Sequence, residues 1–563
     1  MSRSRVTVVF STFLLGVVLA SAVSGQEPQP LSPRGVPEDW THHHIIFSAD
    51  FLRSHPEIFV REPRALHQVY RRWGRVLTPN AGVDLNNTAQ KKSGTDWFVQ
   101  LGAGTTAFGT SPAKYQTDPT APPSCVKDFV VFGINANGLQ QVGATNGQAT
   151  IVAYNELYTG PNGVGGICAT DPGGPGPAYV FSYNTSTITN GKIRTSPVIS
   201  VDGKKLAFVE SSASGSALHI LQFGTTGNNG NNVVIPVIPG TGNNAVMTTF
   251  NYTTANNNHS SPWVDYASDT LYVGADDGKL YKFTGVFKGT PTQVSTGGWP
   301  VSIAGAAIQV TGPVFDSTTG NLFVGDARGM LHSVNAASPA TITNLAVGTA
   351  GRPNSQILDA PILDSYGNVF ATSSNDGTSA VVVQASAATL AQKARIRIGG
   401  GSTLGTSVNL YDGDFDNNFY NSENTGHYVL CGTGTSTTGT TSPYRYRLSI
   451  SGGLLQTDNA PVQISTSTTA RCGPLTEFFN PNISGGTDYF FWGVTNNCVG
   501  AAGCLMELAN AATVTTALET NGTSAVIIDN DSTQPQCSNI YFASQGGSLA
   551  TRLATKLTQN GLQ

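Results

Sequence analysis

An acidic segment in the second half of the chain has the spacing of a calcium-binding loop. The oxygen ligands of this twelve-residue pattern would be Asp412, Asp414, Asp416 and Glu423. Asn417 stands where such loops usually have Gly, and Asn tolerates that backbone conformation. The flanking segments are predicted strands rather than helices, so this is not an EF-hand. The segment is either a calcium site or, as the simpler interpretation, a hairpin rich in Asp and Asn.

A run of three histidines, from His42 to His44, precedes the apolar residues Ile45 and Ile46. Strand alternation would place His42 and His44 on one face as a weak chelating pair. Two imidazoles without a nearby carboxylate or third histidine on that face make a poor metal site. We therefore expect this segment to pack as a structural strand.

A repeated pattern of strands and turns must position any such site. A small residue followed by proline precedes an apolar strand in four copies, which start at Pro197, Pro262, Pro313 and Pro361. An Asp stands three residues after the proline in the last three copies. A tight turn ending in glycine then follows the second strand, at Gly278, Gly329 and Gly377. Such turns supply the positive φ that a two-residue hairpin needs.

The spacing of the repeats predicts an all-β fold, a β-propeller. The steps between the four prolines are about 65, 51 and 48 residues, and the shorter ones match one four-stranded blade. Looser copies occur at 128–183, 408–452, 473–509 and 523–556, which gives eight candidate repeats. One repeat could be split to close the ring, or the first could belong to an extension, so the pattern leaves seven or eight blades open. The main structural alternative is a β-solenoid, whose shorter rungs need no hairpin turns.

Cationic side chains occur at equivalent positions of three repeats. Arg194, His259 and Arg471 each stand three residues before a proline that opens a repeat. If these prolines start the innermost strands, the three side chains would surround the mouth of the central channel, where propellers usually bind ligands. They would then favour an anionic ligand. Otherwise they are solvated loop residues that make turn contacts.

One repeat resembles a known family of propellers. The segment Leu271 to Phe283 is similar to a blade of the quinoprotein-like (PQQ-type) propellers, and Leu322 to Val334 is a weaker copy. The chain also resembles a group of exported bacterial propeller proteins of unassigned function, in the segments Trp40 to His44, Asp128 to Phe132 and Thr476 to Asn480. These resemblances imply the fold more than any chemistry.

The quinone-dependent alcohol dehydrogenases of that superfamily have features that this sequence lacks. It has no adjacent Cys-Cys pair and only six tryptophans, without the repeated tryptophan docking motif. We therefore expect a non-catalytic binding or scaffold propeller for a protein or an envelope polymer, with no cofactor apart from the calcium that the acidic segment suggests. The alternative is an enzyme at the channel mouth, either quinone-dependent or acting on glycans. Clustered acids facing the channel would favour the enzyme, and a broad neutral or aromatic face would favour binding.

The N-terminal part of the chain divides into a signal peptide and an extension. Arg3 and Arg5 precede an apolar run that ends in small residues, which predicts a signal peptide over 1–25. We assign 26–120 to an extension and 121–563 to the propeller. The extension contains one predicted helix, which starts at Pro63 and ends near Gly74, with an apolar stripe at Leu66, Val69, Tyr70 and Trp73. Its opposite face carries Arg64, Gln68, Arg71 and Arg75, as a solvated basic face or as a surface for an acidic partner or cell-wall polymer.

Composition and cysteines indicate a β-rich protein outside the cytoplasm. Charged residues make up only 11% of the chain, while 64 glycines favour turns. The net charge of −4 gives no general attraction to nucleic acid, and no later segment is apolar enough to cross a bilayer. Seven cysteines fit a secreted or periplasmic protein. The preferred pairs are Cys125 with Cys168 and Cys498 with Cys504, and Cys537 is the expected free thiol.

Overall fold

The structure is a computed structural model, and it describes most of the chain. The described residues are 35–69, 72 and 94–558, apart from short gaps at 120, 141–145, 162–163, 170–175, 353–354, 400–409, 434–441, 458–460, 482–485, 500–501, 510–511 and 531–535. The predicted signal peptide lies outside them.

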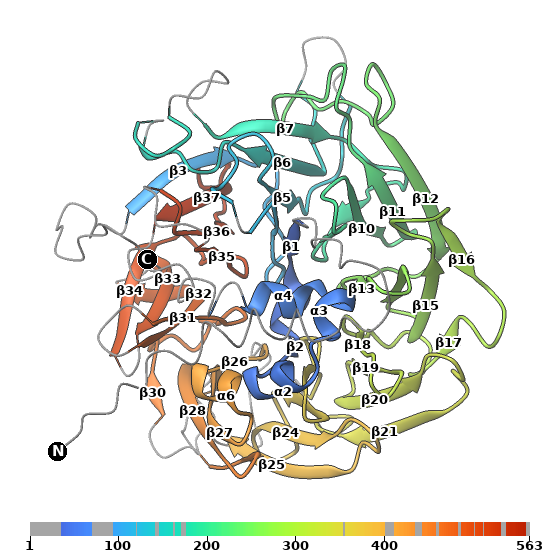
Figure 1. Cartoon of the computed structure of the whole chain (residues 1–563), viewed down its shortest axis with the longest axis vertical. Coiled ribbons are helices and arrows are strands. Elements are labelled where there is room, and N and C mark those ends of the chain that lie inside the picture. The colour runs from blue at the N-terminus through green and yellow to red at the C-terminus, as the bar shows by residue number, and fades with distance from the viewer. Residues whose placement is uncertain are drawn as a thin grey trace, which may run out of the picture.

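The described strands form eight sheets arranged in a ring, an eight-bladed β-propeller (Figure 1). The fold class predicted from the repeats is confirmed, and of the two blade counts left open, eight is correct. In each blade the innermost strand follows the loop that contains the proline or its equivalent.

Blades 1 to 4 follow one another along the chain. Blade 1 contains β4 (Ala113–Gln116), β5 (Phe129–Gly133), β6 (Ile151–Asn155) and β7 (Ala178–Tyr183). Blade 2 contains β8 (Lys192–Ile193), β9 (Val198–Ile199), β10 (Lys205–Ser212), β11 (Gly215–Gln222) and β12 (Val246–Thr253). Blade 3 contains β13 (Trp263–Asp265), β14 (Thr270–Gly274), β15 (Lys279–Thr284), β16 (Thr292–Val294) and β17 (Val301–Ser302). Blade 4 contains β18 (Val314–Asp316), β19 (Asn321–Gly325), β20 (Met330–Asn335) and β21 (Ile342–Ala346).

Blades 5 to 8 complete the ring. Blade 5 contains β22 (Ile362–Asp364), β23 (Asn368–Ser373), β24 (Ala380–Ser386) and β25 (Gln392–Ile398). Blade 6 contains β26 (Asp414–Phe415), β27 (Thr425–Thr433), β28 (Pro443–Ser451), β29 (Leu454–Leu455) and β30 (Val462–Gln463), and α6 (Asn417–Asn421) follows its first strand. Blade 7 contains β31 (Thr476–Asn480), β32 (Thr487–Val499), β33 (Ala502–Ala509) and β34 (Ala512–Leu518). Blade 8 contains β35 (Ile527–Asp529), β36 (Asn539–Ala543), β37 (Leu553–Thr558) and β3 (Gly94–Gln100).

Strands from the N-terminal part of the chain complete the first and last blades. In blade 8, β3 pairs antiparallel with β37, so this blade combines a strand from the N-terminal part of the chain with strands from its C-terminal part and closes the ring. In blade 1, β4 pairs with β5. Both strands precede residue 121, the predicted start of the propeller. The partner of β3 is more than 400 residues away in sequence, so this pairing could not be recognised from the sequence.

The repeated turns have the predicted geometry. Gly278, Gly329 and Gly377 follow the second strands of blades 3, 4 and 5, and all have positive φ. In the same blades an aspartate ends the innermost strand and accepts the backbone N–H two residues later, at Asp265, Asp316 and Asp364. The turns and the aspartates therefore serve the fold.

Three disulfides link the described cysteines. Cys125 pairs with Cys168 and Cys498 with Cys504, as predicted, and Cys431 pairs with Cys472 between blades 6 and 7. Cys537 is free and buried, which confirms its assignment. Within the described part of the chain, no helix has the length and apolar character needed to cross a membrane.

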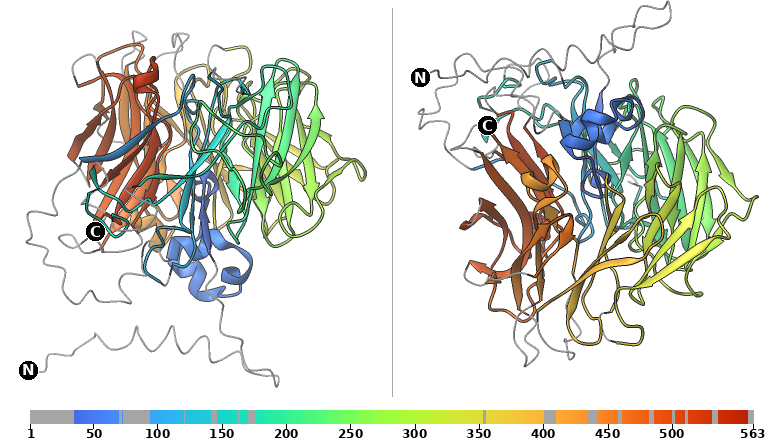
Figure 2. Two further views of the ribbon diagram at one scale, coloured as in Figure 1. Left: turned by 90° about the horizontal axis from the view of Figure 1, so that it is seen from above. Right: turned by 60° about the horizontal axis from the view of Figure 1, so that its bottom comes forward.

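The N-terminal extension is folded into the ring rather than placed beside it. It contains β1 (Val36–Glu38), the 3₁₀-helix η1 (Trp40–His43), β2 (Ile45–Ile46), α2 (Ala49–Ser54), α3 (Ile58–Arg61) and α4 (Pro63–Val69). Helices α2 to α4 lie together at one end of the ring (Figure 2). The prediction of one helix is thus only partly right, although α4 begins at Pro63 as expected.

Candidate ligand site at the channel mouth

Residues 35–49, which we call the plug, cross the centre of the ring. β1 adds to the inner edge of blade 1 by antiparallel pairing with β4, and β2 adds to blade 5 by parallel pairing with β22 (Figure 1). Blades 1 and 5 are opposite each other in a ring of eight. The plug therefore spans the channel, with η1 between its two strands, and almost all of it is buried.

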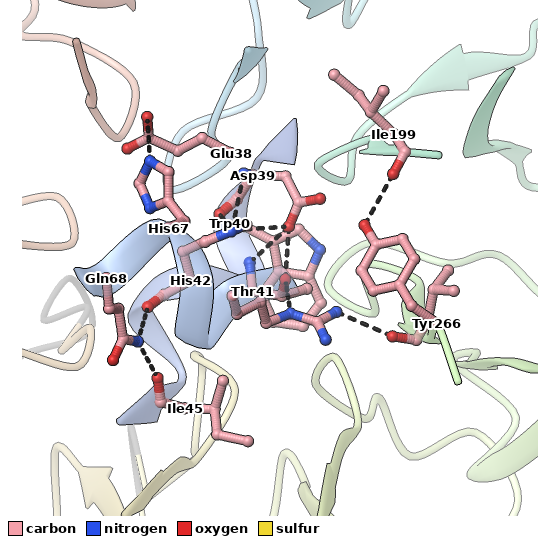
Figure 3. Close-up of polar contacts among 12 residues, drawn as sticks. Glu38, Asp39, Trp40, Thr41, His42, Ile45, His67, Gln68, Ile199 and Tyr266 are labelled. Atoms are coloured by element: carbon pink, nitrogen blue, oxygen red, sulfur yellow. Dashed lines mark hydrogen bonds and ion pairs between the residues drawn. The ribbon is translucent and has the colours of Figure 1, made fainter. Parts of the chain in front are cut away.

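A buried polar cluster holds η1 on its helix-facing side. Asp39 caps η1 and accepts hydrogen bonds from the backbone and hydroxyl of Thr41. His42 Nδ1 accepts the backbone N–H of Asp39 at 3.1 Å, and His67 Nε2 lies 3.2 Å from Glu38 Oε2 (Figure 3). Burial lowers the pKa of His42 to about 4, so this ring is neutral at pH 7.

Helix α4 presents the opposite face to that predicted. Arg64 and Gln68, expected on a solvated basic face, are buried. The guanidinium of Arg64 lies over the ring of Trp263 and donates to the carbonyl of Val264. Gln68 donates to the carbonyl of Ile45 at 2.6 Å. A buried arginine needs paired acceptors. They are the carboxylate of Glu62, the hydroxyl of Thr41 in the plug and the carbonyl of Val264 in β13, which periodicity alone did not reveal. Arg71 and Arg75 lie outside the described residues.

On the other side of η1, the loops that enter the innermost strands surround a small cavity of about 60 Å³. Trp40, His43 and His44 of the plug line it. The small residues that start the blades also line it, namely Ser111, Ser196, Ser261, Gly312, Ala360, Gly413 and Ala525. Five of these precede a proline, so the sequence repeat marks the wall of the channel mouth. Because a water needs about 10–15 Å³ of such space, the cavity has room for a few waters or the tip of one side chain.

Two aspartates from neighbouring blades lie next to each other in the lining of this cavity. Asp359 precedes the innermost strand of blade 5, and Asp412 holds the equivalent position of blade 6. The backbone N–H of Asp412 lies 3.3 Å from Asp359 Oδ2, and Asp412 accepts the hydroxyl of Thr372. Burial raises the pKa of Asp359 to about 7. Burial and the charge of Asp359 raise the pKa of Asp412 well above its ordinary value.

Other blades have hydroxyl side chains at this position. Ser260, Thr311 and Ser524 each accept a backbone N–H from the second strand of their own blade. The fold therefore needs only a short hydroxyl here. Asp359 and Asp412 are departures from the repeat that the fold does not require.

Several buried nitrogen and oxygen atoms of lining residues have no hydrogen-bond partner among the described residues. They are His43 Nε2, His44 Nδ1, His259 Nδ1 and Asp412 Oδ2. His44 Nε2 lies 3.8 Å from Asp359 Oδ1. Burial, with the charge of His43, lowers the pKa of His44 to about 3, so its ring is neutral and keeps a lone pair. Unpaired buried polar atoms are costly, and their concentration at one cavity is typical of a ligand site.

The three predicted cationic residues are only partly brought together. Arg194 and His259 line the cavity, whereas Arg471 precedes the innermost strand of blade 7 but is not part of the lining. Burial lowers the pKa of His259, so it is neutral at pH 7. Arg194 binds Asn258 at 2.5 Å. The three do not form a cationic ring, because Arg471 is not part of the lining and His259 is neutral.

The four carboxylates of the predicted calcium loop do not converge. Their partners are different groups, in order Thr372 for Asp412, Tyr420 for Asp414, His427 for Asp416 and Tyr366 for Glu423. The segment forms a strand and then a short helix that Asp416 caps, so it does not wrap around one point. Among the residues described by the structure, no group of three or more His, Cys, Asp or Glu could hold a metal ion.

The three histidines also diverge. Strand alternation was the wrong premise, since His42 and His43 belong to a 3₁₀-helix. His42 faces the polar cluster around Asp39, His43 lies 3.6 Å from Asp414, and His44 faces Asp359. His42 and His44 therefore form no chelating pair.

Asp359 and the role of Asp412 at the mouth were not predicted from the sequence. The signal was present, because both stand two residues before an innermost strand or its proline, where five other repeats have Ser or Thr and blade 7 has Cys472. No pattern in the sequence indicates that the plug lines the cavity, since this depends on contacts between distant parts of the chain.

No protein family model and no curated protein matches this chain. Among solved structures it is similar to BamB from Moraxella catarrhalis, with 11% identity, a TM-score of 0.42, and coverage of 83% of this chain and 100% of that one. It is also similar to the Dos1 propeller, with 10% identity, a TM-score of 0.44, and coverage of 83% and 95%. A computationally designed protein, Ika8, gives 11% identity, a TM-score of 0.41, and coverage of 82% and 99%. These similarities concern the fold alone.

Proposed function

We propose that the protein is an exported, non-catalytic binding propeller that holds a protein or an envelope polymer at the channel mouth. The observation that carries the proposal is the cavity between η1 and the blade loops, whose lining includes buried polar atoms without partners in the described part of the chain. A rigid wall supplied by every blade suits a preformed binding site.

The size of the cavity favours an inserted side chain. Pockets for drug-sized ligands are usually about 300–1,000 Å³, whereas this cavity measures about 60 Å³. A quinone cofactor or a sugar ring needs the larger volume. The tip of one side chain from a bound partner needs only the smaller.

Export is supported by two features. The segment 1–25 has the pattern of a signal peptide, and three disulfides stabilise blades 1, 6 and 7. A binding partner would then be a secreted protein or a component of the cell envelope.

The Asp359 and Asp412 pair favours an enzyme as the second candidate. Two neighbouring buried carboxyls, one of them protonated near pH 7, are the groups that acid–base hydrolysis uses. The small volume of the cavity argues against a bound glycan, so we place this candidate second. Loss of a measured hydrolytic activity in Asp412→Asn, with partner binding retained, would reverse the order.

Site-specific photocrosslinking tests the binding function. Phe108 lines the mouth, and Tyr366 is exposed on a turn between β22 and β23, at the other end of the innermost strand. Each is replaced by p-benzoylphenylalanine, which preserves an aromatic ring, and the cells are irradiated before envelope and secreted fractions are analysed. We expect one defined adduct from position 108 and none from position 366. Equal adducts at both positions, or none at 108, would contradict binding at the mouth.

A further inference from the structure

We propose that the channel-mouth cavity binds a primary ammonium group, the tip of a lysine side chain of the protein partner, between Asp359, Asp412 and His44. This inference rests on the proposed function and names the chemistry of its site. The shared chemistry of a partner lysine and a free alkylamine is the ammonium with its short alkyl stem.

Three residues that line the cavity carry acceptors for a group with three N–H donors. Asp412 Oδ2 has no partner among the described residues, and neither does Nδ1 of His44, which is only 7% exposed. Asp359 keeps 15% of its side chain exposed while lining the cavity. With its Nε2 toward Asp359, His44 leaves the Nδ1 lone pair for a donor from the ligand. An ammonium would thus satisfy atoms that the protein leaves unpaired.

Charge favours a cation over an anion at the two carboxyls. No lysine or arginine of the described chain forms an ion pair with Asp359 or Asp412, and the one ion-pair contact of Asp359 is with His44. Their mutual repulsion and their burial are both relieved when a cation sits between them. Arg194 lies in the same lining but is engaged by Asn258.

The rest of the lining suits an alkylammonium better than a metal ion. Trp40, Phe108 and Tyr411 line the cavity, and Phe108 packs against Tyr411 with ring centroids 5.7 Å apart. Aromatic faces attract ammonium groups and cover methylene stems. A metal needs donors converging at about 2.0–2.6 Å, and no such group is found in the described residues. Hydrogen bonds from an ammonium are about 2.7–3.2 Å long, so its acceptors can lie farther apart than the ligands of a metal ion.

Binding should release a proton, because the carboxyl pair is partly protonated when empty. An ammonium binds the ionised carboxyl of Asp359 better than its protonated form, so affinity rises as the pH increases through about 7. The other titratable groups facing the pair come from the plug and from blades 2, 3 and 6, namely His43, His44, Arg194, His259, Tyr411 and Tyr428. The histidines with lowered pKa stay neutral over this range, so the carboxyls determine the slope.

The test is isothermal calorimetry of the mature protein with n-butylammonium chloride, a mimic of the lysine side chain. The neutral control is n-butanol, and calcium chloride is titrated separately. Two buffers of different ionisation enthalpy report the protons released. We expect binding of butylammonium with proton release near pH 7, and no binding of butanol. Asp412→Asn should weaken it by about ten-fold or more.

A second variant protects the test against misfolding. Asp359→Thr with Asp412→Thr restores the hydroxyl found at this position in other blades, so we expect it to fold and to lose butylammonium binding. Retained binding in this variant, or binding of calcium instead of butylammonium to the unaltered protein, would overturn the proposal. A lysine-containing adduct from position 108 would identify the partner's side chain as the source, whereas butylammonium binding without any adduct would point to a free amine.

The two proposals fail separately. If position 108 gives an adduct but butylammonium does not bind, the ammonium chemistry is wrong and the binding function stands. If butylammonium binds without an adduct, the cavity chemistry stands and the partner is not a protein.

Discussion

Arg72 and Glu477 form a buried ion pair between the end of the N-terminal extension and blade 7. Arg72 Nη1 donates to Glu477 Oε1 at 3.0 Å, and the second guanidinium nitrogen also contacts this carboxylate. Their side chains are 3% and 0% exposed. Although burial opposes it, the carboxylate raises the pKa of Arg72, which stays charged. The pair therefore anchors the extension to blade 7.

Removing one partner of this pair should be strongly destabilising. Arg72→Ala leaves the Glu477 carboxylate buried without its cation, and we expect a loss of about 3–5 kcal/mol in the free energy of unfolding. The exposed pair of Arg53 with Asp50 is the control, where Arg53→Ala should cost less than about 1 kcal/mol. Urea unfolding followed by tryptophan fluorescence measures both. Equal losses would show that the Arg72 pair does not anchor the extension.

The repeats could be predicted because each is local in sequence. The proline at position 262 and the turn at Gly278 lie within one blade, so the alternation of strand and turn was visible in a short window. The register of the repeats, the turn residues and two disulfides could be predicted from such short stretches of sequence.

The contacts of the plug and of the rest of the N-terminal extension could not be predicted in the same way. Arg72 and Glu477 are 405 residues apart, and the pairing of Ile45 with Leu363 joins segments more than 300 residues apart. The arginine spacing on α4 is compatible with a solvated face. Arg64 is instead buried against Trp263 and Val264 of blade 3, which is about 200 residues away in sequence. Such contacts have no signal in one sequence.

Stability should fall as the pH rises from about 6.5 to 8. Burial and the nearby Asp364 raise the pKa of Glu423 to about 8, and burial raises that of Asp359 to about 7. Above about pH 4.5 the unfolded chain has released these protons, while the folded chain keeps them. Each group therefore lowers the free energy of unfolding by about 1.4 kcal/mol per pH unit, up to its pKa in the folded protein. His42 and His44 have lowered pKa values, so they change the stability only below about pH 6.5, where they make it rise with pH.

The variant Glu423→Gln isolates this effect. Its amide retains the size of the side chain without an ionisable proton, so the decline between pH 6.5 and 8 should be smaller by up to about 2 kcal/mol. Urea unfolding at several pH values measures the slope for the variant, for the unaltered protein and for Glu57→Gln at an exposed site. An unchanged slope in Glu423→Gln would refute the assignment to Glu423.

The disulfides should differ in their contribution to the free energy of unfolding, according to the lengths of the loops that they close. Cys125–Cys168 closes a loop of 43 residues and Cys498–Cys504 a loop of 6. By loop entropy, the first contributes about 4 kcal/mol and the second about 2 kcal/mol. Replacing each pair by alanines should therefore lower the unfolding free energy more for the first. The difference should shrink under reducing conditions, and a larger loss from the second pair would contradict the loop-entropy account.

Strand β3 should be the seam that closes the ring. Trp97 on this strand is buried against Tyr154 and Tyr541, and its Nε1 donates to the carbonyl of Leu157. Its neighbour Phe98 points the other way and is 63% exposed. The two adjacent aromatic residues therefore differ in burial but share the same strand and the same pairing with β37.

This contrast gives a matched pair of variants. Trp97→Ala removes a ring from the contact between blades 1 and 8, and we expect a loss of about 3–5 kcal/mol. Phe98→Ala should change stability by about 0.5 kcal/mol or less. Limited proteolysis at the chain ends, alongside urea unfolding, should show β3 released first in Trp97→Ala, because the ring opens where its two ends meet. Equal stability of the two variants would mean that blade 8 closes without β3, through the three strands from the end of the chain alone.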